Sequence, residues 1–101
     1  MKVTFRTKSL EKACTNDSYA IKMYGEKVAN KIFQRVAQMK AANSVEYLIE
    51  NRIGRCHPLK GNMKNKYALD LGHPTRMIIV KCKVDDNQIK EVMVTDILDY
   101  H

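Results

Sequence analysis

The sequence is poor in cysteine and contains no long apolar run. Its three cysteines, Cys14, Cys56 and Cys82, are odd in number and far apart, which argues against a disulfide framework and against a cysteine-rich zinc site. No apolar segment approaches the roughly 18 residues of a membrane-spanning helix. The first residues, MKVTFRTKSLEK, lack the apolar core of a signal peptide. We therefore expect a cytoplasmic protein that does not enter a membrane.

The histidines lack the spacing that a metal site needs. His57, His73 and His101 are not four residues apart on a predicted helix, which is the usual arrangement of a zinc-binding pair. They also have no cysteine cluster beside them. We expect neither a metal ion nor another cofactor.

Positive charge is what the chain has in excess. Eighteen Lys and Arg residues outnumber eleven Asp and Glu residues, for a net charge of +7. Such an excess favours nucleic acid, an anionic membrane surface or an acidic protein partner, although an ordinary soluble protein can also be basic. The charge is densest from Arg52 to Lys66, which holds five Lys or Arg residues and one histidine. No acidic residue occurs from Asn51 to Leu69.

Apolar periodicity predicts three helices in the first half of the chain. The longest carries apolar residues three and four positions apart, with Gly25 inside it at a cost of about 1 kcal/mol relative to alanine. Ser9 and Ser44 are the expected N-caps of the two shorter helices. The predicted ranges are Ser9–Ala13, Tyr19–Ala42 and Val45–Glu50.

Alternating apolar and polar residues predict strands at the start and in the second half of the chain. The short connections between the later strands favour an antiparallel meander, with helices on one face and the other face open. In the last strand Val92 and Val94 share one face, and Asp96 is the candidate third member. The predicted strands are Lys2–Arg6, Lys66–Leu71, Arg76–Val84 and Lys90–Leu98, with a turn at Asp85–Asn87. The whole predicts one α+β domain, residues 1–101, with two or three N-terminal helices packed on a curved, mainly antiparallel sheet.

Three cations on the long helix follow each other at four-residue intervals: Lys27, Lys31 and Arg35. Residues at this spacing share one side of a helix, so they form a basic row on its solvated face. Like charges at this spacing repel by a few tenths of a kcal/mol per pair. The row is either a plain exposed face or a surface that follows phosphates or an acidic partner, and the sequence leaves both open.

Titratable and cationic residues come from three segments that this fold would bring together. Imidazole groups exchange protons near neutral pH, and preorganised cations stabilise charge that develops on a phosphate. Tyrosine can stack on a base or donate a proton. The candidate catalytic residues are His57, Arg76, Asp99, Tyr100 and His101, with Asp99 as a possible orienting partner of His101. The candidate cations for binding the phosphates of a nucleic acid, which the resemblance described below implies is RNA, are Arg55, Lys60, Lys64 and Lys66.

Three nearby residues are better explained by structure. Cys56 and His57 could form a nucleophile and its base, but adjacent residues of a strand point to opposite faces, which favours a structural cysteine. His73 precedes Pro74 and is typical of a turn. Asp70 more simply balances local charge.

The segment RCHPLKGNMKNKYALDLGHPTRMIIV and the final DYH resemble the plasmid-maintenance killer proteins, the HigB branch of the RelE/ParE toxin superfamily. The resemblance covers nearly the whole chain and depends on HPLKG, the H-P-x-R turn and DYH together. It implies a RelE-like fold and the toxin of a type II toxin–antitoxin pair. In the RelE and HigB branches the implied activity is ribosome-dependent mRNA cleavage. The 2′-hydroxyl attacks its own 3′-phosphate without a metal ion.

The resemblance also implies partners. These are a cognate antitoxin with a helix-turn-helix, the ribosome with its mRNA, and DNA only through the toxin–antitoxin complex. Two alternatives stay open at this point. ParE-like relatives share the fold and poison DNA gyrase, and a basic module of this size could bind RNA without cleaving it.

Overall fold

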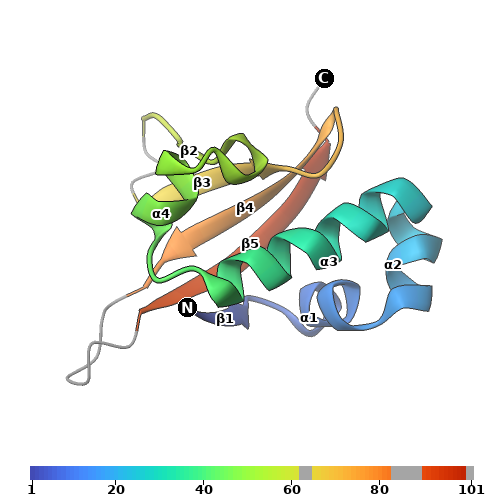
Figure 1. Cartoon of the computed structure of the whole chain (residues 1–101). Coiled ribbons are helices and arrows are strands. Elements are labelled where there is room, and N and C mark those ends of the chain that lie inside the picture. The colour runs from blue at the N-terminus through green and yellow to red at the C-terminus, as the bar shows by residue number, and fades with distance from the viewer. Residues whose placement is uncertain (62–64, 83–89, 100–101) are drawn as a thin grey trace.

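The computed structural model describes residues 1–61, 65–82 and 90–99. Helices cover one face of a five-stranded sheet, with α3 crossing the sheet and α4 lying over β3 (Figure 1). The elements in chain order are β1 (Lys2–Phe5), α1 (Lys8–Thr15), α2 (Asp17–Tyr24), α3 (Glu26–Ala41), α4 (Val45–Glu50), the 3-10 turn η1 (Ile53–Arg55), β2 (His57–Pro58), β3 (Lys66–Asp70), β4 (Thr75–Lys81) and β5 (Glu91–Asp99). This arrangement confirms the predicted α+β fold. The turn predicted at Asp85–Asn87 lies outside the described residues.

The sheet has the strand order β1-β5-β4-β3-β2. Neighbours from β2 to β5 are antiparallel, as the short connections predict. β1 instead pairs with β5 in parallel, so the first and last strands of the chain lie side by side. Alternation within a strand does not give its direction, and β2 is too short to show a pattern of its own. The sequence pattern therefore could not predict the parallel pairing of β1 or the presence of β2.

The expected long helix is two helices, which corrects the Tyr19–Ala42 prediction. Gly25 adopts φ 86° and ψ 161° between α2 and α3, a region that is essentially reserved for glycine. Its N–H donates to Ile21 O and closes α2, while its carbonyl accepts from Ala29 N and opens α3. At the other ends, Thr7 rather than Ser9 caps α1, and Ser44 caps α4 as predicted.

A bulge in β5 decides which residues of that strand face the helices. Ile79 pairs with Val94 but Ile78 pairs with Asp96, so Thr95 is the extra residue. Asp96 is therefore placed on the face opposite Val94, and its expected position beside Val92 and Val94 is wrong. On that face Arg6 donates from Nε to Thr95 O at 2.9 Å and lies 3.4 Å from the Asp96 carboxylate.

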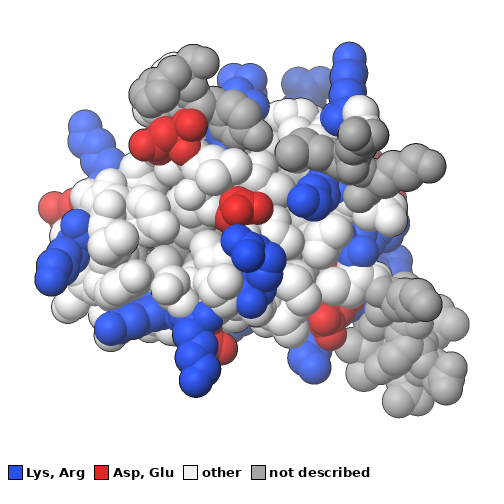
Figure 2. Space-filling model, turned by 180° about the vertical axis from the view of Figure 1, so that it is seen from behind, with Lys and Arg blue, Asp and Glu red and all other residues white. Residues whose placement is uncertain are grey.

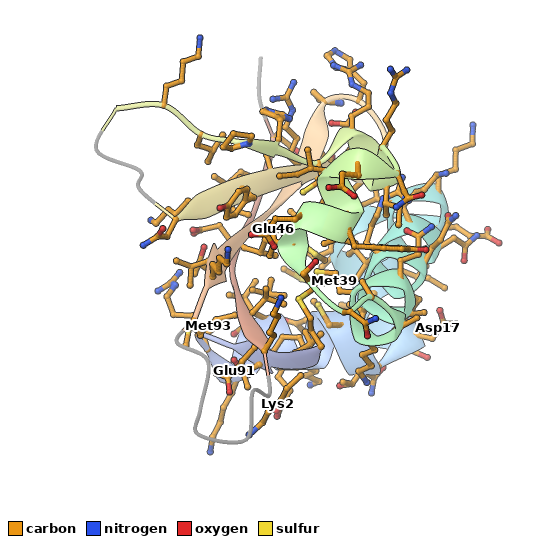
Figure 3. The ribbon with its side chains drawn as sticks, turned by 60° about the vertical axis from the view of Figure 1, so that its left-hand side comes forward. Lys2, Asp17, Met39, Glu46, Glu91 and Met93 are labelled. Carbon is orange, nitrogen blue, oxygen red and sulfur yellow. The ribbon has the colours of Figure 1, made fainter. Side chains whose placement is uncertain are left out.

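The core lies between the helices and one face of the sheet. Ile32, Met39 and Leu48 pack against Met77 and Ile79, and all five are fully buried. Figure 3 shows Met39 between the helices and the sheet, whereas Met93 lies on the sheet's far side. Within the described part of the chain, no helix is long and apolar enough to cross a membrane.

Replacing Gly25 by alanine distinguishes the two-helix structure from the continuous helix. In the structure, the Gly25→Ala change forces a strained backbone and should lower the free energy of unfolding by about 1–3 kcal/mol. In a continuous helix the same change would raise it by about 1 kcal/mol. Urea denaturation measures the difference, and a stabilised variant would contradict the break at Gly25.

Candidate functional site at the Asp70 end of the sheet

Two arginines converge on the carboxylate of Asp70 at the end of β3. Arg55 Nε lies 3.3 Å from Asp70 Oδ2, and Arg76 Nε lies 3.7 Å from Asp70 Oδ1. Arg76 is paired with Asp70 across β3 and β4, one position from core-facing Met77. Because neighbours in a strand alternate faces, Arg76 lies on the face that the helices leave uncovered, as predicted.

A third arginine binds the same residue from the inside. Arg35, on α3, is only 8% exposed. Its Nε donates to the Asp70 carbonyl at 2.8 Å, and its Nη1 donates to Gln38 Oε1 at 2.9 Å. Burial lowers the pKa of the Arg35 guanidinium, and the negative charge of Asp70 opposes that shift. Arg35 therefore does not belong to the solvated basic row predicted with Lys27 and Lys31, and that part of the prediction is wrong.

Arg35 also fits closely against η1. A Cβ atom at Gly54 would lie 2.6 Å from Arg35 Nε, a distance that no real contact allows. Gly54 and Arg55 both have left-handed backbones, with φ of 58° and 52°. The absence of a side chain at Gly54 thus lets η1 press against the guanidinium. The buried Arg35 positions the turn that carries Arg55.

His57 follows that turn on β2. It pairs with Ala68, which places it on the uncovered face with Arg76. Its Nδ1 lies 2.8 Å from Arg55 O. Because a carbonyl oxygen can only accept a hydrogen bond, Nδ1 carries the hydrogen, and in the neutral ring Nε2 is the atom that accepts a proton. The geometry therefore suits His57 to proton transfer.

Cys56 has the structural place that the sequence favoured. Its side chain is buried in the helix-side core, on the opposite side of the strand from His57. Burial raises the pKa of the Cys56 thiol to about 11, so the reactive thiolate is scarce at neutral pH. A Cys56–His57 nucleophile and base pair does not form.

The predicted lysines lie away from Asp70. Lys66 shares a face of β3 with Asp70, but four residues along the strand place it about 13 Å away. Lys60 is exposed after β2, where Leu59 N donates to Lys66 O. Lys64 lies outside the described residues. The structure thus brings Arg55 and Arg76 together at Asp70. His57, which pairs with Ala68, lies on the same face at a position midway between Asp70 and Lys66.

Asp99 lies on the other face of the same end of the sheet. Thr75 Oγ1 donates to Asp99 Oδ1 at 2.7 Å. Burial first, and then nearby negative charges that include Asp99, raise the pKa of Tyr24 on α2. Asp99 is therefore turned toward the helices and away from Arg76 and His57. Tyr100 and His101 lie outside the described residues, so their catalytic roles stay predictions.

Sequence reasoning missed the central position of Asp70. One signal was available, because Asp70 is the only acidic residue between Glu50 and Asp85. A single carboxylate within so basic a segment is expected to attract more than one cation.

The uncovered sheet face is shown in Figure 2, which views the molecule from behind. Lys and Arg side chains stand around its edge and also near the middle of the view beside an acidic side chain, and much of the remaining area carries neither charge. Among residues 1–61, 65–82 and 90–99, no group of three or more His, Cys, Asp or Glu side chains could hold a metal ion.

Solved toxin structures share this fold. The chain is similar to YoeB in a YoeB–YefM complex from Staphylococcus aureus, with a TM-score of 0.62, 21% identity and coverage of 100% of this chain and 97% of that one. It is also similar to a YoeB/ParE toxin from Agrobacterium tumefaciens, with a TM-score of 0.59, 15% identity and full coverage of both chains. A heterotetrameric YoeB–YefM toxin–antitoxin complex from Staphylococcus aureus gives a TM-score of 0.55, 20% identity and coverage of 100% and 97%.

No protein-family model matches the sequence, and no curated protein sequence matches it. At these identities the solved structures establish the fold alone. The chain has the RelE-like fold of the YoeB toxins, as predicted from the resemblance.

Comparing Arg35 with Lys31 tests whether Arg35 is a buried structural cation. Arg35→Met leaves the Asp70 carbonyl and Gln38 without their donor, so it should lower the free energy of unfolding by about 1–3 kcal/mol. Lys31→Met, one turn earlier and exposed, should change it by no more than about 0.5 kcal/mol. Urea denaturation measures both variants. Equal changes in the free energy of unfolding would indicate that Arg35 is as exposed as Lys31, and would contradict the structure.

Proposed function

We propose that this chain is the toxin of a type II toxin–antitoxin pair and that it cleaves mRNA on the ribosome. The observation that carries the proposal is the Asp70 cluster, the pair of guanidinium groups on the Asp70 carboxylate, with the His57 imidazole on the same face of the sheet. The fold it shares with solved YoeB–YefM toxin–antitoxin complexes supports the toxin assignment. The HigB branch stays a prediction from the resemblance alone.

The proposed reaction is an internal displacement at phosphorus. The 2′-oxygen of the RNA forms a bond to its own 3′-phosphorus, and the bond from phosphorus to the next nucleotide's 5′-oxygen breaks. In this proposal His57 Nε2 takes the 2′ proton, and a second acid gives a proton to the leaving oxygen. Arg55 and Arg76 stabilise the added negative charge on the phosphoryl oxygens. The products are a 2′,3′-cyclic phosphate and a 5′-hydroxyl.

The side chains of Arg55 and Arg76 differ in how freely they can move toward a phosphate. The Arg55 side chain is 77% exposed, whereas Arg76 and Asp70 are 28% and 27% exposed. Arg76 is thus held as part of the surface, and Arg55 can turn toward an incoming phosphate. Tyr100 and His101 are candidates for the acid, with Asp99 beside them in the sequence.

The proposed partners follow from this role. The toxin would meet ribosome and mRNA in the cytoplasm, with its 101 residues acting as one domain. A cognate antitoxin, with a helix-turn-helix if the HigB resemblance holds, would neutralise it. DNA would be bound only through that complex. Lys60, Lys64 and Lys66 would extend the contact with RNA.

A gyrase poison is the second candidate, because one similar structure is a YoeB/ParE toxin. Such a poison needs no residue that transfers protons. It predicts broken DNA and lost supercoiling activity rather than cut mRNA. A plain RNA-binding module predicts salt-sensitive affinity without any product.

Variants of the cluster test the nuclease proposal. His57→Gln should lower mRNA cleavage by about 10²–10⁴-fold, because glutamine cannot transfer the proton. Arg76→Gln should lower it by about 10²–10³-fold. Arg6→Gln is the matched control, since Arg6 is also an arginine paired with an aspartate on this face. Induced expression with mapping of mRNA 5′ ends measures cleavage, and growth arrest is scored in parallel.

If His57→Gln and Arg76→Gln both cleave mRNA at the full rate, these residues take no part in the reaction. Growth arrest without new mRNA ends, together with inhibited gyrase, would favour the second candidate.

A further inference from the structure

A groove lies on the helix side of the same corner of the molecule. It encloses about 490 Å³ between the first half of α3 and the β3–β4 turn. Lys27, Val28 and Lys31 line it from α3, and Leu71, Gly72 and His73 line it from the turn. The described mechanism uses none of these residues.

The groove is cationic at its rim. Lys27 and Lys31 lie one helical turn apart and are both exposed, and His73 faces them from the turn. None of the described residues that line the groove is acidic. The two lysines repel each other by a few tenths of a kcal/mol, and a bound anion would relieve that repulsion. The charge of the groove therefore complements an anion.

The floor of the groove is apolar. Val28 packs against the core and is partly exposed beneath the charged rim, while Leu71 behind it is fully buried. Gly72 has no side chain, and nothing lies within 4 Å of the place where its Cβ would be. An apolar floor under lysine heads suits a ligand with a flat apolar part and a phosphate. A nucleotide has both parts.

The groove and the Asp70 cluster share the turn between β3 and β4. An extended chain advances at most about 3.6 Å per residue, so His73 lies within roughly 11 Å of Asp70. Arg76 follows on the other strand, paired with Asp70. One RNA strand can therefore contact both places by passing around the turn. An acidic peptide would match the charge of the groove but has no corresponding reason to continue to the cluster.

We propose that this groove binds a nucleotide of the RNA strand whose neighbouring phosphate is held by Arg55 and Arg76. This inference rests on the proposed nuclease function and adds a second contact for the substrate. Lys27 and Lys31 bind the phosphate of that nucleotide, and its base lies on Val28.

Salt-dependent binding of a non-cleavable RNA tests the groove. The probe is a fluorescent 2′-O-methyl octanucleotide, and its affinity for the full chain is measured by anisotropy at several KCl concentrations. Each phosphate contact adds about 0.7 to the slope of log affinity against log salt for a single strand. Because both lysines are proposed to hold the same phosphate, the double variant Lys27→Gln and Lys31→Gln should lower that slope by about 0.7, and the affinity at 0.1 M salt by roughly fivefold.

The matched control changes two exposed lysines that do not line the groove, Lys8→Gln and Lys40→Gln. It removes the same charge and should change the slope by less than half as much. Equal slopes for the two double variants would overturn the proposal, because general charge would then explain both. Normal RNA binding by the groove variant, with weakened binding of a helical Leu/Glu peptide, would overturn it in favour of an acidic peptide.

The Arg76→Gln variant, measured in the same assay, distinguishes failure of the groove proposal from failure of the proposed RNA site. If Arg76→Gln lowers the slope and the groove variant does not, only the groove proposal fails. If neither variant lowers it, the RNA site of the proposed function fails as well.

Discussion

The candidate site depends on one buried contact, the hydrogen bond from Arg35 to the carbonyl of Asp70. A guanidinium keeps its charge in proteins, and placing it in the interior is costly unless strong acceptors surround it. The Asp70 carbonyl and Gln38 supply those acceptors, and Gly54 leaves the room. The contact joins α3, β3 and η1 at one point. Without this contact, η1, which carries Arg55 and leads to His57, would no longer pack against a fixed Arg35 side chain.

Asp70 links this structural hydrogen bond to a pair of ionic contacts at the surface. Its backbone oxygen is bound from the inside by Arg35, while its carboxylate faces outward to Arg55 and Arg76. The carboxylate offsets the repulsion between two like-charged groups and keeps them near each other before any ligand arrives. Preorganised charge of this kind acts on a reacting phosphate without first having to rearrange. The same basic corner continues around the β3–β4 turn into the groove at Lys27 and Lys31.

Local patterns in the sequence were enough for the fold class, the main strands and the uncovered position of Arg76. They failed at Gly25, Arg35 and Asp96. Gly25 fits the helical period on both sides, and only its backbone angles show that two helices meet there. Arg35 shares a spacing with Lys31, yet its burial depends on a glycine 19 positions later in the chain. Asp96 follows Val92 and Val94 in alternation, and a bulge reverses its face. The errors at Arg35 and Asp96 come from contacts between distant segments, which periodicity does not record, whereas the break at Gly25 is a local backbone conformation.

The central claim is that side chains around Asp70 cut RNA by using its own 2′-hydroxyl. The most direct measurement is the analysis of product ends from an mRNA cut on purified ribosomes, with and without a 2′-deoxy nucleotide at the cut. The account predicts a 2′,3′-cyclic phosphate and a 5′-hydroxyl, and no cut at the 2′-deoxy position. Cleavage that survives the 2′-deoxy substitution, or that leaves a 3′-hydroxyl and a 5′-phosphate, would contradict it.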